Sequence, residues 1–142
     1  MSQFRCQIVT PSESFLDEMV EYVSFPAWDG QVGVMNSTSA FLTEVGAGAL
    51  RIDFGNGSRH YLLDGGFAQM QDEVLTLLSD SIIPADQIDL VDAEEELQAA
   101  NVAAVEPGRN APEDRRSIEH AQERATAKVN LAQMSSGRAG SV

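Results

Sequence analysis

Glycines and short apolar segments alternate between Asp29 and Ile52, and this stretch constrains the fold more than any other part of the chain. Its apolar segments, Val32–Met35, Phe41–Val45 and Ala49–Phe54, are separated by a polar loop and by glycines. They show no helical period, and short segments bounded by glycine and polar residues are typical of β-strands. We therefore predict β-structure here, and we interpret the stretch as a docking surface rather than a reaction centre.

Segments of the same kind continue on both sides as far as Ile83. The residues that favour strands are Phe4–Val9, 19–25, Val32–Met35, Phe41–Val45, Ala49–Phe54, His60–Leu63, Phe67–Met70, Val74–Ser79 and Ile82–Ile83. Turns are predicted at Asp29-Gly30, Asn56-Gly57 and 71–73, a bulge or tight bend at Gly65-Gly66, and a strand end at Pro26. Many short strands with frequent turns predict an antiparallel β-sandwich of about ten strands, or a barrel.

The pattern becomes helical after Pro84. Glycine and proline are absent from Ile88 to Val105, and Asp86 or Asp89 can cap a helix there. Its apolar face would be Leu90, Ala93, Leu97, Ala100 and Ala104.

A second helix is expected from Asn110, with Glu113 as its capping-box partner. Its apolar face would be Ile118, Ala121, Ala125, Val129 and Ala132. Because both faces are rich in alanine, they bury little area, which predicts a helical hairpin that can open. The tail from about Ser135 is rich in glycine and serine and is expected to be frayed. The predicted domains are residues 1–86, the sandwich, and 87–142, the hairpin.

The net charge of −13 disfavours several classes of partner. Residues 1–86 carry three basic against twelve acidic side chains, and residues 87–142 carry six against ten. Nucleic acid and anionic lipid both bind basic faces, so neither is an expected partner. No secretory signal opens the chain and no apolar run reaches the roughly 20 residues that span a bilayer, so we expect no direct membrane insertion.

No group of residues forms a recognisable catalytic or metal-binding pattern. His60 and His120 lie far apart in sequence, without carboxylates or cysteines at metal-ligand spacing. Cys6 is the single cysteine, so it forms no internal disulfide and is interpreted as core filling. Gly46-Ala47-Gly48 lacks the third glycine and the following helix of a dinucleotide loop. Residues 94–96 are interpreted as a solvated acidic helix face.

Seven segments in a fixed order carry a resemblance to a known family: Ile8–Pro11, Val20–Val23, Asp29–Met35, Val45–Ile52, Tyr61–Phe67, Val74–Asp80 and Ile88-Asp89. In this order and spacing the sequence resembles the ε subunit of the bacterial rotary F-type ATP synthase, whose mitochondrial counterpart is called δ. The resemblance covers nearly the whole chain. It implies a ten-stranded β-sandwich followed by a two-helix hairpin.

The resemblance also implies a function without catalytic residues in this chain. It implies a central-stalk subunit of the rotor, which couples proton flow through the c-ring to ATP synthesis. The implied partners are the γ subunit and the c-ring, and the α/β catalytic head when the helices extend and inhibit ATP hydrolysis. The implied location is peripheral, on the cytoplasmic side of the bacterial inner membrane.

Two groups of residues are candidates for these contacts. Candidates for the rotor interface are Gly30, Gln31, Val32, Gly33, Val34, Met35, Thr38, Phe41 and Leu42. Candidates for the inhibitory helix are Arg115, Arg116, Arg124 and Lys128, in a helix with little net positive charge. Within the first group, an apolar shelf of Val34, Met35, Phe41 and Leu42 is expected to carry most of the contact.

The chain departs from the family pattern near the rotor interface. Asn36–Ala40 stands where the family usually has Pro-Gly-His-Ala-Pro, which predicts a more adaptable backbone because proline no longer fixes φ. Gln31 stands where the family usually has an acid between two glycines.

A third departure concerns nucleotide binding. Some members bind ATP between the helices through an Ile/Leu-Asp-x-x-Arg-Ala motif. This chain retains Ile88, Asp89 and Ala93, but Asp92 replaces the arginine. Its carboxylate would repel a triphosphate, so we expect no cofactor and little or no regulatory ATP binding.

Two other functions stay open on the residues. A free-standing β-sandwich module that binds a protein or a small ligand would also fit an acidic sandwich with a helical tail. An acidic enzyme of unrecognised type has no residue set to support it.

Overall fold

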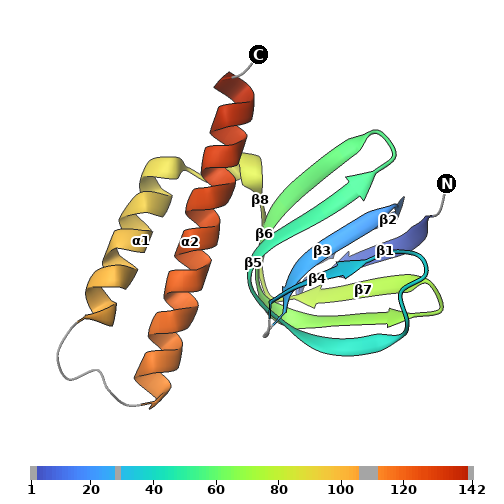
Figure 1. Cartoon of the computed structure of the whole chain (residues 1–142), viewed down its shortest axis with the longest axis horizontal. Helices are drawn as coiled ribbons and strands as arrows, with labels where there is room; N and C mark the ends of the chain where they lie inside the picture. The colour runs from blue at the N-terminus through green and yellow to red at the C-terminus, as the bar shows by residue number, and fades with distance from the viewer. Residues whose placement is uncertain (1–2, 28–29, 106–111, 141–142) are drawn as a thin grey trace. The chain divides into compact units, whose positions relative to one another are not determined.

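The computed structural model describes residues 3–27, 30–105 and 112–140, and Figure 1 shows their elements. The chain divides into two compact units, Met1–Ile83 and Pro84–Val142. The first unit is a β-sheet domain and the second is helical. Each is described by itself.

The β-sheet domain is one continuous sheet that closes over its own inner face. Its strands within the described residues are β1 (Phe4–Val9), β2 (Ser14–Val20), β3 (Tyr22–Ala27), β4 (Gly30–Val34), β5 (Phe41–Phe54), β6 (Gly57–Gln71), β7 (Val74–Ser79) and β8 (Ile82–Pro84). Neighbours follow the order β2-β1-β7-β6-β5-β3-β4, and β8 pairs with β6. Because the long strands β5 and β6 curve from one layer to the other (Figure 1), the predicted β-sandwich is confirmed.

One pair of strands differs from the predicted antiparallel arrangement. β1 runs parallel to β7, with Arg5 opposite Val74 and Val9 opposite Leu78. The other pairs of assigned register are antiparallel, so the sheet is mixed. Apolar alternation shows which face a residue occupies but not the direction of the neighbouring strand, so the sequence pattern could not reveal this pairing.

Two predicted breaks between strands are absent. The segments predicted on either side of Gly46–Gly48 form the single strand β5, and those on either side of Gly65-Gly66 form β6. Eight observed strands thereby account for about ten predicted ones. Along β5 the buried residues change from odd to even positions, with Val45 before the change and Leu50 after it. Such a change is expected where a strand bends from one layer into the next.

The bend predicted at Gly65-Gly66 is present. The φ angles are +85° at Gly65 and +124° at Gly66, which side chains rarely tolerate. A hairpin turn of positive φ also occurs at Asp72-Glu73, with φ of 53° and 62°, between β6 and β7. Two positive values in a two-residue loop are typical of a type I′ turn, although neither residue is glycine or asparagine.

Two predicted boundaries were wrong. Pro26 lies inside β3 rather than at its end, and the strand predicted at residues 19–25 is split at Glu21 between β2 and β3. The pairing of β3 with β5 is irregular between Ser24 and Ala27, so proline sits where the regular ladder is interrupted.

The position of one hairpin turn differs from the predicted position by one residue. The β5–β6 hairpin turns at residues 55–56 rather than at Asn56-Gly57, because Phe54 pairs with Gly57. The turn predicted at Asp29-Gly30 includes Asp29, which lies outside the described residues.

Alternating side chains fill the sandwich core. In β1, Phe4, Cys6 and Ile8 are buried while Arg5 between them is exposed. The other buried core residues are Leu16, Val20, Val23, Phe25, Val34, Val45, Leu50, Ile52, Tyr61, Leu63, Ala68, Met70, Leu75 and Leu77. The core therefore draws on every strand from β1 to β7.

The helical unit consists of η1 (Ala85–Gln87), α1 (Leu90–Ala104) and α2 (Pro112–Gly140). α1 and α2 pack side by side, which confirms the predicted helical hairpin (Figure 1). Asp89 is the N-cap of α1, because its carboxylate accepts the backbone N–H of Val91 at 2.8 Å and of Asp92 at 3.2 Å.

The buried face of the hairpin is close to the predicted one. Buried residues are Ala93 and Ala100 in α1, and Ile118, Ala125, Val129, Leu131 and Ala132 in α2. Ala121, predicted on this face, is exposed, and Leu131 was not predicted. α2 extends to Gly140, beyond the expected start of a frayed tail, and the predicted N-cap Asn110 lies outside the described residues.

Candidate functional site

The β4–β5 loop is closed by two hydrogen bonds between the same two residues. The N–H of Thr38 donates to the carbonyl oxygen of Met35 at 3.1 Å. In return, the N–H of Met35 donates to Oγ1 of Thr38 at 2.9 Å. These bonds give the turn at Asn36-Ser37 a defined conformation without proline. The threonine hydroxyl therefore restricts a backbone that the sequence suggested would be adaptable.

The predicted apolar shelf divides into buried and exposed residues. Val34 is fully buried, and Phe41 stacks on Phe25 with ring centroids 6.2 Å apart. Met35 is 55% exposed and Leu42 is 72% exposed. The structure therefore assigns Val34 and Phe41 to the core or its edge, because alternation turns them inward, and leaves Met35 and Leu42 on the surface.

The remaining rotor-interface candidates lie on β4, the last strand of the sheet path. Gly30, Gln31 and Gly33 are exposed and Val32 is half-buried. The Gln31 amide donates to Oγ of Ser24 at 2.9 Å and to the carbonyl oxygen of residue 49 at 3.4 Å. A carboxylate cannot donate either bond, so Gln31 ties β4 to β3 and β5 in a way that an acid could not.

Two glycines of the opening stretch allow close packing across the sheet. A Cβ on Gly33 would lie 2.5 Å from the hydroxyl of Tyr22, and a Cβ on Gly48 would lie 3.0 Å from Cβ of Pro26. Both glycines are therefore explained by a neighbouring side chain that covers the backbone. Their role is therefore structural.

An exposed apolar row crosses the outer face of the sandwich, and the sequence analysis missed it. Leu78 of β7 pairs with Val9 of β1 on one side and with Phe67 of β6 on the other. Their exposed fractions are 37% for Val9, 51% for Leu78 and 54% for Phe67. We call these three residues the outer apolar row. Each is an outward residue in an alternating strand, and only the strand order brings them together.

The row continues towards the predicted interface. Phe67 pairs with Glu44 of β5, and Leu42 lies two residues before Glu44 on the same face of that strand. Leu42 therefore lies on the same face as the outer apolar row, with the exposed acid Glu44 between it and Phe67. Exposed apolar residues that gather on one face mark protein-binding surfaces in soluble proteins.

The described residues offer no group of side chains that could hold a metal ion. No cluster of three or more His, Cys, Asp or Glu side chains with metal-binding geometry occurs among them. Burial, and then the charges of Asp17 and Glu18, raise the pKa of the Cys6 thiol to about 12, as expected for a core residue rather than a nucleophile. No helix of this part of the chain is long and apolar enough to cross a membrane.

Comparison with known proteins decides the family. The family described as the ATP synthase delta/epsilon chain, β-sandwich domain, matches residues 3–85. The chain belongs to this family. An ATP synthase epsilon chain of Rhodopirellula baltica is 36% identical over 96 residues, covering 68% of this chain and 75% of the relative. An epsilon chain of Nitratidesulfovibrio vulgaris is 30% identical over 128 residues, covering 90% of both chains.

Other members of the delta/epsilon family extend the comparison. The Propionigenium modestum protein, described as an epsilon chain that is sodium ion specific, is 31% identical over 105 residues, which are 74% of this chain and 77% of that protein. A chain in the mitochondrial ATP synthase OSCP/F1/c-ring structure of Euglena gracilis superposes with a TM-score of 0.80 at 21% identity. The superposition covers 93% of this chain and 82% of that chain. At this identity the superposition supports the fold only.

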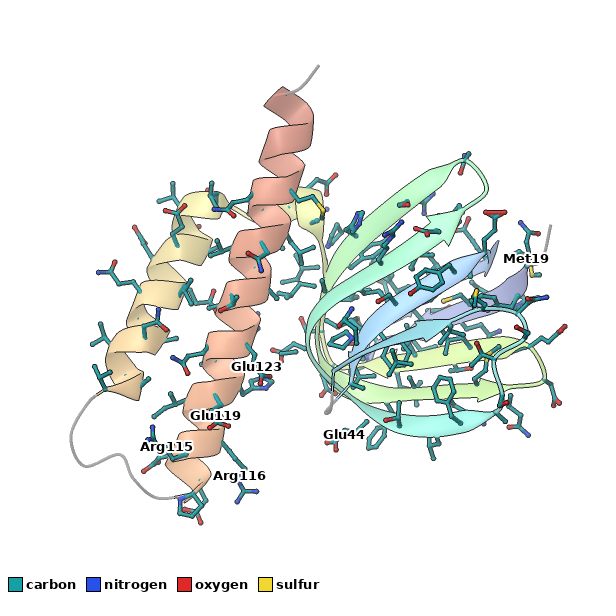
Figure 2. The ribbon with its side chains drawn as sticks, viewed as in Figure 1. Met19, Glu44, Arg115, Arg116, Glu119 and Glu123 are labelled. Atoms are coloured by element: carbon teal, nitrogen blue, oxygen red, sulfur yellow. The ribbon has the colours of Figure 1, made fainter. Side chains whose placement is uncertain are left out.

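The four cations predicted for an inhibitory helix fall into two pairs. Arg115 and Arg116 are exposed near the start of α2, and the acids Glu119 and Glu123 follow them on the same helix (Figure 2). The other pair, Arg124 and Lys128, contacts α1 through Glu96, as described below. The structure therefore does not unite the four cations in one basic patch.

The motif by which some family members bind ATP has a different role here. Asp89 caps α1, and the exposed side chain of Asp92 lies in its first turn. A hollow of about 370 Å³ on α1 lies further along the helix and contains no basic residue. Its lining consists of Glu94, Leu97, Gln98, Asn101, Val102 and Val105. The residues that line this hollow offer no cation to a triphosphate.

Proposed function

We propose that the chain is a non-catalytic subunit of the central stalk of a rotary F-type ATP synthase, with its sandwich docked on the γ subunit and the c-ring. The observation that carries this proposal is the family match over residues 3–85, the sandwich that presents the exposed apolar surface. Met35, Leu42 and the outer apolar row would supply the contact area. The relatives named above are epsilon chains, which supports the same role.

In this role the chain contributes to the mechanical coupling of ion flow through the c-ring to ATP synthesis, and it does no chemistry of its own. We propose protons as the ion on the resemblance to bacterial enzymes. One relative is described as sodium ion specific, so the ion has to be measured. The complex would place the chain at the cytoplasmic face of the bacterial inner membrane, as a peripheral subunit without a membrane-spanning segment of its own.

Regulation of ATP hydrolysis is a second part of the proposal. When the helices extend towards the α/β catalytic head, α2 would inhibit hydrolysis. Supporting this, the hairpin buries mainly small side chains, so its two helices can separate at low cost. Residues 112–123 hold two arginines and four acids, and this excess of acids argues against strong inhibition by the first part of α2.

Co-purification with the rotor tests the docking role. The chain should co-purify with co-expressed γ subunit and c-ring, and a variant lacking residues 87–142 should do so equally well, because it retains the sandwich. A chain that never co-purifies would favour the free-standing β-sandwich module instead. In the reconstituted enzyme, the same deletion should raise ATP hydrolysis, and unchanged hydrolysis would rule out the inhibitory role without affecting the docking role.

A further inference from the structure

One carboxylate connects the two helices of the hairpin through two cations. The Oε1 atom of Glu96 on α1 accepts a hydrogen bond from an Nη atom of Arg124 at 2.7 Å. Its Oε2 atom accepts from Nζ of Lys128 at 2.8 Å. Arg124 and Lys128 are four residues apart on α2, so both reach the same carboxylate from one helix face. We propose that Glu96, Arg124 and Lys128 form a charge latch that holds the hairpin closed.

Partial burial strengthens the attraction between the three charges of the latch. The exposed fractions of the side chains are 37% for Glu96, 24% for Arg124 and 19% for Lys128. Partly buried charges are screened less by salt and water than charges on an open surface. The latch also lies beside small buried residues, Ala93, Ala100 and Ala125, which contribute little apolar area. Ile118, Val129 and Leu131 bury larger side chains elsewhere on α2, and Gln122 donates a hydrogen bond to Asn101 of α1 at 3.0 Å, so the charged contact adds to these.

Loss of the carboxylate would affect both cations together. Without Glu96, Arg124 and Lys128 would face each other as like charges at i, i+4, in a partly dehydrated place. The simplest relief is separation of the helices, which returns both cations to water. A single acid thus pairs with two positive charges on α2.

The latch gives the regulatory part of the proposed function a specific mechanism, and this consequence rests on that function. In the closed hairpin, Glu96 pairs with two of the four cations proposed for inhibition. Opening would separate both Arg124 and Lys128 from Glu96 and allow them to bind an acidic protein surface. The closed and open forms would therefore differ in the positive charge that α2 exposes as well as in shape.

Distance measurement in the isolated full-length chain tests the latch without reference to the complex. Spin labels are attached to Ala99→Cys in α1 and Thr126→Cys in α2, both exposed positions. Cys6 can remain, because it is buried and does not compete for the label. The test variant is Glu96→Gln, and the matched control is Glu95→Gln, the exposed neighbour on the same helix.

We expect one short distance in the parent chain and in the Glu95→Gln control. Glu96→Gln should raise the ratio of open to closed hairpin by about tenfold, the lower end for hydrogen bonds to charged groups. A charge-swapped variant that combines Glu96→Lys with Arg124→Glu and Lys128→Glu should restore the short distance. Lys128→Glu in the otherwise unchanged chain should also open the hairpin, because it places a second acid beside Glu96.

Two results would overturn the latch. One is an unchanged distance in Glu96→Gln, and the other is opening that the charge-swapped variant does not reverse, which would assign the effect to packing. If Glu96→Gln loses helical circular dichroism, Lys128→Glu decides, and an unchanged short distance in that variant would reject the latch. Failure of the chain to co-purify with the rotor would reject the proposed function and leave this result intact.

Discussion

Gly66 lies directly against the carbonyl oxygen of Leu78 on the neighbouring strand, and a Cβ atom has no space between them. The φ angle of +124° at Gly66 excludes most side chains for a second, independent reason. Both constraints arise where β6 bends between the layers of the sandwich. This glycine is therefore needed for the path of the chain itself.

Gly66→Ala should strongly destabilise the sandwich. The added Cβ would have to displace backbone, so we expect a loss of about 3 kcal/mol or more. For a unit of this size, thermal denaturation should show a midpoint lower by more than about 10 °C. Gly46→Ala is the matched control on β5, because its Cβ would lie at an ordinary 3.7 Å from the carbonyl oxygen of Ala27. Equal midpoints for the two variants would contradict the role given to Gly66.

The sequence predicted most of the fold for a local reason. Glycines mark bends, alternation marks the buried face, and a period of three to four marks helices, and all three can be read over a few residues. The bend at Gly65-Gly66 and the cap at Asp89 are examples. The parallel pairing of β1 with β7 joins residues about seventy positions apart, and no local pattern encodes it.

The candidate surface was only partly predictable for the same reason. Met35 and Leu42 are apolar residues beside a turn, so their sequence neighbourhood pointed to them. The outer apolar row needs the strand order, since Val9, Phe67 and Leu78 come from three separate strands. The latch likewise depends on which faces of α1 and α2 meet, and Glu96 looked like part of a solvated acidic run.

Met35→Asp should weaken assembly with the rotor more than Thr38→Ala does. The first change puts a charge on an exposed apolar residue and leaves the folded chain nearly unaffected, but it should cost about 2 kcal/mol when a partner covers it. Thr38→Ala removes the hydroxyl that accepts the Met35 N–H but keeps the backbone bond in the other direction. Co-purification of γ subunit and c-ring with each variant measures the difference.

Met19→Asp is the control for an exposed methionine elsewhere. Met19 is 50% exposed on β2, at the opposite end of the sheet path from β4 (Figure 2). Its cross-strand partner is Arg5, so an acid there is tolerated. The prediction is wrong if Met35→Asp and Thr38→Ala co-purify with equal amounts of γ subunit and c-ring. It is also wrong if Met19→Asp loses as much of these subunits as Met35→Asp.

ATP should not bind the helical unit with micromolar affinity. Asp89 is occupied as the N-cap of α1, Asp92 adds a negative charge in the same turn, and Glu96 neutralises Arg124 and Lys128. Isothermal titration of ATP into the chain should give no binding heat in this range. Asp92→Arg restores the residue of the ATP-binding motif and serves as the comparison. Micromolar binding by the unchanged sequence would show that the motif tolerates Asp92.

Low pH should open the hairpin, and protonation of Glu96 should account for part of this opening. Burial raises the pKa of Glu96, but the hydrogen bond and charge of Lys128 and the charge of Arg124 outweigh burial and hold the pKa below its ordinary value of 4.5. A carboxylate with a lowered folded pKa stabilises the closed form fully above the unfolded pKa. That contribution is lost as the pH falls through the folded value. The negative charge that Glu96 presents to Arg124 and Lys128 is then lost.

The distance between labels at positions 99 and 126, followed from neutral pH to below pH 4.5, measures this opening. The parent chain and Glu95→Gln should open as the pH falls below the ordinary glutamate value. Glu96→Gln should already have a larger open fraction at neutral pH, and this fraction should change much less with pH, because the variant has lost the carboxyl group of residue 96. Because the chain has many other carboxylates, the result is the difference in pH response between Glu95→Gln and Glu96→Gln. A parent chain and a Glu96→Gln variant that open in parallel would show that other acids control the hairpin.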